Sequence, residues 1–193
     1  SDPLGRWVWA TLWGRQRERV TIVSMYRPNI GSLASGPATV WAQQRSRIQE
    51  TMGSESSRID VDPRKKCLTD YKKWADALKV AGHKVILMTD ANQSVNDRKE
   101  KYNLSNLMSS NRLISAMDVK HEGQAQQSVA RGLTTIDHIL LQEINPTQLL
   151  RAGQLPFGLG FHSDHRGIFA DLDGEHLLKL LMTKPATRES RRL

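Results

Sequence analysis

The chain has 193 residues, 38% of them hydrophobic and 25% charged, which is enough for one domain with a sizeable core. It contains no run of about 18 apolar residues and no basic and apolar leader, so we expect neither a membrane span nor secretion. A single cysteine, Cys67, excludes an internal disulfide and a zinc site built from cysteines, and it predicts an intracellular protein, nuclear or cytoplasmic.

Basic residues outnumber acidic ones: 28 Lys and Arg stand against 20 Asp and Glu, for a formal net charge of +8. This surplus suits a polyanionic partner, nucleic acid before membrane, because cations displace the counterions condensed on phosphates. A charge run is more often a solvated face, so the surplus favours nucleic acid only modestly. The charges gather in three clusters: Arg15, Arg17 and Arg19; Arg64, Lys65, Lys66, Lys72 and Lys73; and Arg188, Arg191 and Arg192.

The first third of the chain predicts two strands and a polar helix. Large apolar residues alternate over residues 7–13 and recur over residues 19–26, and a basic turn at residues 14–17 joins the two strands. Residues 28–37 are rich in Pro, Gly and Ser, which indicates a loop. A polar helix is expected over residues 39–52.

The pair Asp62-Pro63 predicts the start of a long helix, because Asp caps a first turn and Pro suits the first helical position. Apolar residues then recur at helical spacing as far as Gly82. A short buried strand over residues 84–88 runs into Asp90. The remaining elements are a helix near residues 104–110, strand-like pieces around Leu113, 136–141, Leu149 and 167–172, and a helix at 177–182 before a basic tail. Strands interleaved with helices predict an α/β layered domain.

Several predicted strands end in side chains that can do chemistry. An aspartate stands at three of these ends: Thr89-Asp90-Ala91-Asn92, Ile136-Asp137-His138 and Ser163-Asp164-His165. A fourth strand ends in Tyr26-Arg27-Pro28-Asn29. Taken singly, each has a structural explanation, since Asp and Asn cap turns and a lone Tyr or His is more often part of the packing. Together, carboxylates and imidazoles at the mouths of buried strands are what metal-assisted or acid–base chemistry on a phosphate needs.

The order of these motifs resembles that of the endonuclease/exonuclease/phosphatase superfamily. This group includes AP endonucleases, deoxyribonuclease I, the endonuclease domains of non-LTR retrotransposons and inositol-phosphate phosphatases. The match spans about residues 20–172 and comprises, in order, Tyr-x-Pro-Asn, Asp-x-Asn, Ile-Asp-His-Ile and Ser-Asp-His. The segment Gly158-Leu159-Gly160-Phe161, the following Ser163-Asp164-His165-Arg166 and the retained Ile-Asp-His look most like retroelement-type or environmental nuclease-like sequences.

The resemblance implies a fold and a division of the chain. The fold would be a layered α/β sandwich of two packed, mostly antiparallel sheets flanked by helices. Residues 1–176 would form the endonuclease/exonuclease/phosphatase-like domain, and residues 177–193 the short helix and basic tail.

Phosphodiester hydrolysis needs a positioned water, a neutralised phosphate and a stabilised leaving oxygen. The resemblance implies that Asp90 orients or deprotonates the water, while Asn92 holds Asp90 and contacts the phosphate. His165 would face the scissile phosphate and donate a hydrogen bond to the developing charge. Asp137 would accept from the other ring nitrogen of His165, which fixes the tautomer and favours the cation. His138 would then be a structural neighbour.

The same resemblance implies that Asp164 is a ligand of the divalent metal and that the hydroxyl of Tyr26 contacts the phosphate. Mg²⁺ is the expected ion, with Mn²⁺ as its substitute, because a hard cation takes oxygen ligands. The expected partner is nucleic acid, DNA before RNA, since a long polyanion rewards a spread of Lys and Arg. A reverse transcriptase, fused or associated, is the further partner that a retroelement-type endonuclease implies.

Two departures from the superfamily pattern bear on activity. Thr89 stands where a glycine usually precedes the Asp-x-Asn pair, which would narrow the space beside the phosphate. The superfamily's upstream Asn and metal-binding Glu have no counterpart, since only six residues precede Trp7; Asp2 and Glu18 are poorly placed to replace that Glu. We therefore expect an N-terminally truncated domain lacking its N-terminal strands, with an exposed sheet edge, weak metal binding and little turnover by residues 1–193.

Three hypotheses of function remain open. The first is a Mg²⁺-dependent phosphodiester hydrolase, a nuclease before a small-molecule phosphatase of the same superfamily, weak or inactive as this chain. The second is a catalytically inactive relic that binds nucleic acid through the basic clusters. The third is a ribonuclease-H-like integrase with three acidic metal ligands, which is disfavoured because residues 7–26 offer no suitable carboxylate and His165 and Asn92 would be unexplained.

Overall fold

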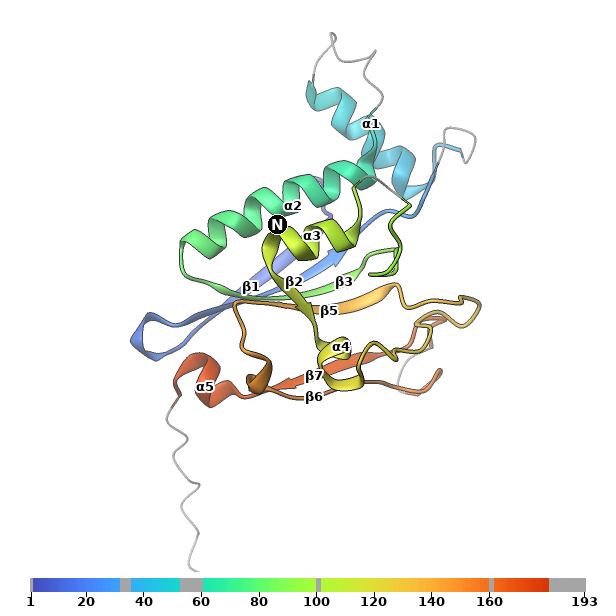
Figure 1. Cartoon of the computed structure of the whole chain (residues 1–193). Helices are drawn as coiled ribbons and strands as arrows, with labels where there is room; N and C mark the ends of the chain where they lie inside the picture. The colour runs from blue at the N-terminus through green and yellow to red at the C-terminus, as the bar shows by residue number, and fades with distance from the viewer. Residues whose placement is uncertain (1, 32–35, 53–60, 100–101, 160–161, 181–193) are drawn as a thin grey trace, which may run out of the picture.

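The computed structural model describes residues 2–31, 36–52, 61–99, 102–159 and 162–180. Two β-sheets are stacked in this part of the chain, with helices on the outer face of the larger sheet (Figure 1). The third basic cluster and the segment Gly160-Phe161 lie outside the described residues. No helix of the described segments has the length and apolar character that crossing a membrane requires.

The larger sheet consists of five strands: β1 (Trp7–Trp13), β2 (Arg19–Tyr26), β3 (Lys84–Asp90), β4 (Leu113–Ser115) and β5 (Asp137–Gln142). Their spatial order is β1-β2-β3-β5-β4. β2 and β3 are parallel, whereas the other three pairings are antiparallel. Parallel neighbours need a long crossover, and the helical segment between β2 and β3 supplies it.

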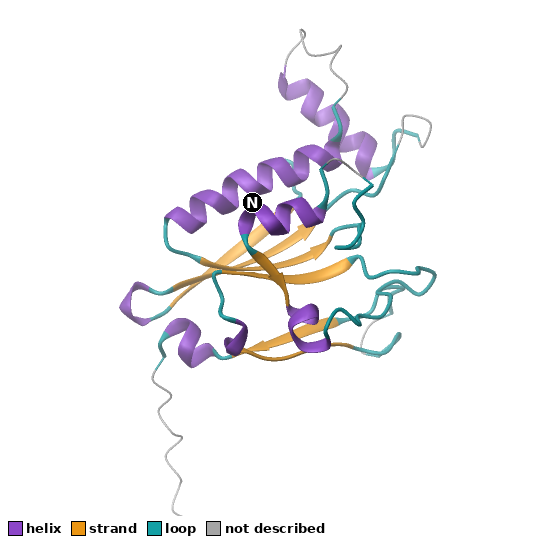
Figure 2. Ribbon diagram, viewed as in Figure 1, coloured by secondary structure: helices purple, strands orange, loops and turns teal. Residues whose placement is uncertain are grey.

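Two helices lie on one face of this sheet, α2 (Pro63–Val80) and α3 (Leu104–Asn111), and α1 (Val40–Met52) packs against α2 and projects away from the sheet (Figures 1 and 2). α2 begins as expected, because the Asp62 side chain accepts a hydrogen bond of 2.8 Å from the backbone N–H of Arg64 and Pro63 occupies the first turn. Burial raises the pKa of the Cys67 thiol on α2 to about 12, which leaves it unreactive.

The other face of the larger sheet is covered by a second layer: the antiparallel pair β6 (Leu149–Gln154) and β7 (Ile168–Leu172), with α4 (Ala116–His121) and α5 (Gly174–Leu178). Two 3-10 turns complete the described elements, at Arg15–Arg17 and Pro146–Gln148. α4 was not expected from the sequence; the Ser115 side chain caps it by accepting from the N–H of Asp118. The helix expected at residues 177–182 begins earlier, because Asp173 caps it, and ends at Leu178.

The fold class is confirmed in a coarser form than expected. The chain is a mixed α/β structure with a mixed five-stranded sheet, a two-stranded sheet and flanking helices. Successive side chains of a strand point to opposite faces, so the larger sheet has a core on each side. Toward α2 the core contains Val23, Leu87, Leu140, Tyr71 and Ala75. Toward the second layer it contains Val20, Ile86, Ile139, Leu141, Leu149 and Leu177.

β1 forms one edge of the larger sheet among the described strands, and this edge carries exposed apolar side chains. The side chain of Trp13 is 68% exposed, with the Arg19 guanidinium over its ring. Trp9 packs against Trp74 of α2, with ring centroids 4.9 Å apart. An exposed edge is what the sequence predicts, and such an edge offers unpaired backbone groups to another strand.

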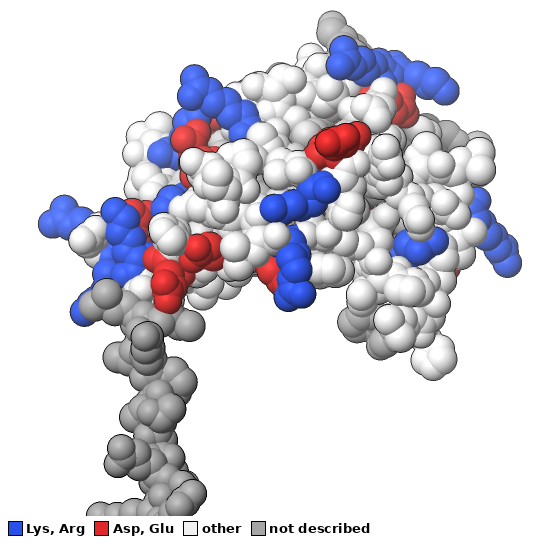
Figure 3. Space-filling model, turned by 60° about the horizontal axis from the view of Figure 1, so that its bottom comes forward, with Lys and Arg blue, Asp and Glu red and all other residues white. Residues whose placement is uncertain are grey.

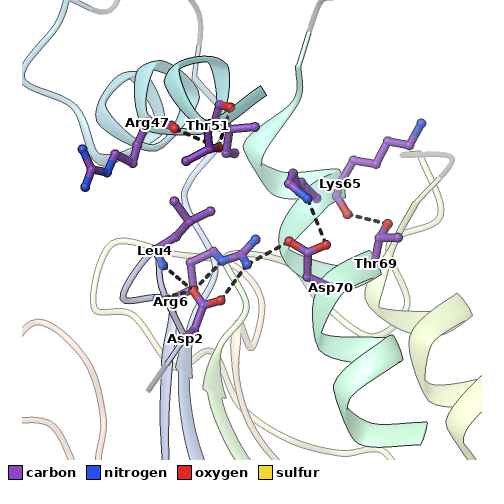
Figure 4. Close-up of polar contacts among 10 residues, drawn as sticks. Asp2, Leu4, Arg6, Arg47, Thr51, Lys65, Thr69 and Asp70 are labelled. Carbon is purple, nitrogen blue, oxygen red and sulfur yellow. Dashed lines mark hydrogen bonds and ion pairs between the residues drawn. The ribbon is translucent and has the colours of Figure 1, made fainter. Parts of the chain in front are cut away.

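A buried ion-pair network ties the N-terminal segment to α2 (Figure 4). The Arg6 guanidinium donates to both carboxylate oxygens of Asp2, at 2.8 Å each, and to Asp70 of α2 at 2.9 Å. The side chains of Arg6 and Asp2 are each only 3% exposed. Removing one partner of such a pair leaves an uncompensated buried charge, which costs far more than the pair itself contributes.

Replacing Arg6 by Met should therefore lower the free energy of unfolding by about 3–5 kcal/mol, because Asp2 would remain buried without its partner. The matched control is Arg47→Met, since Arg47 pairs with Glu50 at the surface, where their side chains are 68% and 61% exposed. That variant should change stability by less than about 1 kcal/mol. Urea denaturation compares the two, and equal losses would contradict the role given to the buried pair.

Candidate active site

Three of the residues singled out in the sequence lie side by side at the ends of neighbouring strands. Tyr26 of β2 is the register partner of Asp90 of β3, and Asp90 is the register partner of Asp137 of β5. Directly opposite residues share a face of the sheet. This face looks toward the second layer, because Ile86 and Ile139 alternate in phase with Asp90 and Asp137 and belong to that core.

His165 reaches this row from the second layer. It lies in the loop before β7, and its Nδ1 donates to Oδ2 of Asp137 at 2.9 Å. The pairing of Asp137 with His165 that the sequence predicts is therefore present. An isolated β-bridge between His165 and Val129, and a hydrogen bond of 3.0 Å from the His165 N–H to the Ser163 hydroxyl, hold the loop.

Ser128 orients the Asp–His pair, although nothing in the sequence pointed to it. Its buried hydroxyl accepts from the backbone N–H groups of Ile136 at 2.9 Å and Asp137 at 3.2 Å. Its carbonyl accepts from the N–H of Arg166 at 2.8 Å. One residue thus connects the strand that carries Asp137 with the loop that carries His165. A serine in a polar loop has no distinguishing local pattern, so only the fold reveals it.

Asn92 holds the turn that follows Asp90. Its backbone N–H donates to Oδ1 of Asp90 at 3.0 Å, and its side-chain amide donates to the carbonyl of Arg27 at 2.8 Å. Its φ of 46° lies in the left-handed region, which Asn tolerates better than most residues. Asn92 therefore holds Asp90 as expected, while its contact with a phosphate stays a prediction.

Two buried arginines, also missed by the sequence analysis, support this turn from behind. The Arg27 side chain is fully buried and donates to Oε1 of Gln93 at 2.7 Å. Arg64, at the start of α2, donates to the carbonyls of Pro28 and Asn92. Because arginine is almost always charged in proteins, this pair brings positive charge close to the strand ends.

The electrostatic setting of Asp90 and His165 suits proton chemistry. Burial raises the pKa of Asp90 above its usual range and the charge of Asp137 adds to this rise, whereas the Asn92 N–H, His165 and Arg64 oppose it. Burial alone would lower the pKa of His165, but the hydrogen bond to Asp137 and the carboxylates of Asp137, Asp90 and Asp164 together raise it. The imidazole is thus held toward its protonated form.

His138 has a different environment, although it is the neighbour of Asp137 in sequence. It points to the opposite face of β5, is buried, and its Nε2 donates to the carbonyl of Gln93 at 2.9 Å. Burial lowers the pKa of His138. These contacts fit the structural role expected for it.

Three side chains can hold a metal ion. Asp90, Asp137 and His165 each offer a ligand atom, and these atoms lie within 4.8 Å of one another. Two carboxylates fit Mg²⁺, which commonly keeps several waters and binds the remainder of its ligands from the substrate phosphate. The imidazole is a better ligand for Mn²⁺ than for Mg²⁺. The hydrogen bond between His165 Nδ1 and Asp137 competes with metal binding by that nitrogen.

The acidic residues considered for the metal in the sequence lie outside this group. Asp164 is exposed, and its backbone carbonyl accepts a hydrogen bond of 2.8 Å from the N–H of Ala130. The assignment of its side chain to the metal stays a prediction. Asp2 is paired with Arg6, and Glu18 is paired with Lys84 at 2.8 Å. Neither of these two replaces the upstream Glu.

A cavity of about 450 Å³ opens beside the cluster. It brings together residues from the first strands, the strand ends and the second layer, including Tyr26, Thr89, Asp90, Asp137 and Arg166. Tyr26 is 39% exposed, so its side chain is accessible from this cavity. Thr89 is buried; its effect on a bound phosphate stays a prediction. The cavity gives a substrate group access to the carboxylates and to the face of the sheet that carries them.

No family model matches the sequence, and no curated protein matches it. Solved structures do match. A 3′ phosphatase from Neisseria bound to a product DNA hairpin gives a TM-score of 0.59 at 18% identity, over 90% of this chain and 66% of that one. The catalytic domain of Xenopus laevis APE2 gives 0.57 at 15% identity, over 86% and 54%. An endonuclease/exonuclease/phosphatase from Beutenbergia cavernae gives 0.51 at 14% identity, over 84% and 37%.

These similarities define the fold. The chain has the fold of the endonuclease/exonuclease/phosphatase superfamily, and it spans about half to two-thirds of the length of the first two of these structures. The resemblance in the motifs is thereby confirmed at the level of the fold. The ribonuclease-H-like alternative is wrong, because that hypothesis requires a different fold.

His165 and His138 should titrate on opposite sides of the ordinary value of 6.5, because Asp137 raises the pKa of His165 and burial lowers that of His138. Stability from the Asp137–His165 pair is present in full below pH 6.5 and is lost as the pH rises through the raised value. NMR titration of the imidazole resonances measures the pKa of each of the two histidines. In Asp137→Asn the pKa of His165 should fall; an unchanged value would contradict the pairing.

Proposed function

We propose that this chain forms the phosphate-cleaving part of a metal-dependent phosphodiester hydrolase that acts on nucleic acid. The observation that carries the proposal is the Asp137–His165 pair, whose 2.9 Å bond sets a raised-pKa imidazole beside a second carboxylate, Asp90. A carboxylate that lines a cavity and an imidazole of fixed tautomer beside it are the groups that general acid–base catalysis on a phosphate requires.

The residues divide the chemistry between them. Asp90, half-buried and held by the Asn92 N–H, accepts a proton from a water and orients it toward the phosphorus. His165 uses Nδ1 for Asp137, which leaves Nε2 to donate to a phosphate oxygen as charge develops there. Asp137 keeps the imidazole in this orientation and stabilises its cation. Tyr26, one strand away from Asp90, adds a hydroxyl donor at the same cavity.

The carboxylates of Asp90 and Asp137 would hold the divalent ion, with Asp164 as a further ligand from the neighbouring loop. When bound, a hard cation such as Mg²⁺ or Mn²⁺ neutralises phosphate charge and lowers the pKa of a bound water.

Nucleic acid, DNA in particular, is the substrate that the charge distribution favours. Lys and Arg are scattered over the face of the second layer, with a group beside the β1–β2 hairpin that contains Arg15 and Lys179 (Figure 3). A further cavity of about 670 Å³ is lined by Asn92 together with the exposed Arg98 and Lys99. Arg98 and Lys99 lie near the cluster, whereas the hairpin group lies at the opposite end of β2. Positive side chains spread in this way suit a long polyanion better than a small phosphate ester.

Finer assignments are also part of the proposal. The Neisseria relative was solved with a DNA product, which supports DNA over RNA for this chain. The sequence pattern also suggests an AP-endonuclease-like or retroelement-type activity, an association with a reverse transcriptase and an intracellular location. Each of these would be tested once cleavage is established.

Cleavage of supercoiled plasmid DNA tests the function, with residues 1–193 and with the full reading frame that contains them. In the full protein, nicking should require Mg²⁺ or Mn²⁺ and stop with a chelator. His165→Ala and Asp90→Asn should each reduce the rate by about 10²- to 10⁴-fold, the range for loss of a general acid or base. Residues 1–193 alone should cleave slowly or not at all.

The structure offers a matched control for His165. Nδ1 of His176 pairs with Asp173 at 2.6 Å in the same manner, but at the surface of α5 and away from the cluster. His176→Ala should leave nicking unchanged. If the full protein binds DNA in a salt-sensitive way and cleaves none under any metal, the inactive-relic hypothesis replaces this one.

Metal binding can be measured without turnover, by the loss of the free Mn²⁺ signal in electron paramagnetic resonance. Asp90→Asn and Asp137→Asn should each weaken Mn²⁺ binding by about tenfold or more, since each removes one of few charged ligands. Asp164→Asn tests the ligand predicted from the sequence, and Asp118→Asn, on α4, is the control. Equal affinity in all four variants would exclude a metal site at the cluster.

A further inference from the structure

Arg166 follows directly after the Asp164-His165 pair. Its side chain combines a ring contact and an Nε unpaired within the described segments, which Arg19 also has, with a place in the lining of the cavity beside the cluster. Its guanidinium lies over the ring of Phe157, 4.1 Å from the ring centroid, and it lines the same cavity as Asp90 and Asp137. Its Nε is buried and has no hydrogen-bond partner among the described residues. Within the same part of the chain, no carboxylate forms an ion pair with it.

Other arginines of the protein use their guanidinium groups in the fold. Arg6 binds two carboxylates, and Arg151 on β6 pairs with Asp171 at 2.6 Å. Arg166 also lies over an aromatic ring, as Arg6 does over Trp7, but no carboxylate of the described residues pairs with it. The cation–π contact orients the guanidinium and satisfies none of its N–H donors. A buried donor without a partner costs free energy, so this arrangement indicates a ligand that supplies the acceptors.

The backbone holds Arg166 in a fixed relation to the Asp–His pair. Its N–H donates to the carbonyl of Ser128, the same residue whose hydroxyl orients Asp137. The guanidinium lines the cavity together with Asp90 and Asp137 and forms an ion pair with neither of them.

We propose that Arg166 binds a phosphate group of the substrate in the cavity lined by Asp90 and Asp137, with Phe157 as its positioning platform. Guanidinium matches the oxygens of a phosphate in a two-pronged contact, and a preorganised donor loses little entropy on binding. The role of this site in catalysis rests on the proposed function. Its binding of a phosphate monoester or diester can be tested without any turnover.

The direct test follows the Arg166 Nε–H resonance in ¹H–¹⁵N NMR spectra while inorganic phosphate, and then a short 5′-phosphorylated oligonucleotide, is added to the full protein. Arg166→Gln should weaken phosphate binding by about 10- to 100-fold, as expected for loss of charge-assisted hydrogen bonds. Arg166→Lys should weaken phosphate binding less than Arg166→Gln does, because lysine keeps the positive charge but lacks the planar guanidinium with its two parallel N–H donors. Phe157→Leu should weaken binding less than Arg166→Gln does.

Arg151→Gln is the matched control, since Arg151 lies on the neighbouring β6 with its side chain 78% exposed and should not affect binding. Thermal melts establish that each variant is folded. In the nicking assay, Arg166→Gln should raise KM and lower kcat/KM. If the wild type binds no phosphate, or if Arg166→Gln and Arg151→Gln bind it equally, the proposal is wrong. Phosphate binding through Arg166 without any cleavage would uphold the site and refute the hydrolase function.

Discussion

The in-register pairing of β3 with β5 is the constraint on which the rest of this structure depends. Both strands lie inside the larger sheet and are buried on both faces, so their apolar side chains must alternate correctly toward two cores. A slip of one residue would turn every side chain of a strand to the other face. The same pairing that satisfies both cores sets Asp90 opposite Asp137 and sends His138 to the opposite side. Core packing therefore enforces the position of the carboxylates.

The second layer completes the site by bringing His165 against Asp137. This contact joins residues 28 positions apart, across the gap between the two sheets. Ser128 holds both sides of it, since its hydroxyl accepts from β5 and its carbonyl accepts from the His165-Arg166 loop. The hydrogen bond to Asp137 thus fixes one ring nitrogen of His165 and leaves the other for a further contact. A site assembled from two layers in this way depends on their packing as much as on its own residues.

Charge is distributed unevenly around the cluster, and this unevenness supports a phosphate ligand. Arg27 and Arg64 are buried behind the Asp90–Asn92 turn and donate to the amide oxygen of Gln93 and the carbonyl of Asn92. Arg166 lies on the opposite, second-layer side. Two carboxylates between positive groups repel each other less, which permits the close approach that a metal or a shared proton requires.

Much of the architecture follows from local signals in the sequence. The Asp62-Pro63 pair predicts the start of α2, and alternating apolar residues predict β1 while a short apolar run predicts β3. The ordered motifs indicate both the fold and the Asp137–His165 pairing. α4 and the true start of α5 were missed, because each depends on a single capping residue. Ser128 and the stacking of Arg166 on Phe157 have no local pattern at all. They arise from contacts between segments that meet only when the two layers pack, which is why periodicity and caps cannot reveal them.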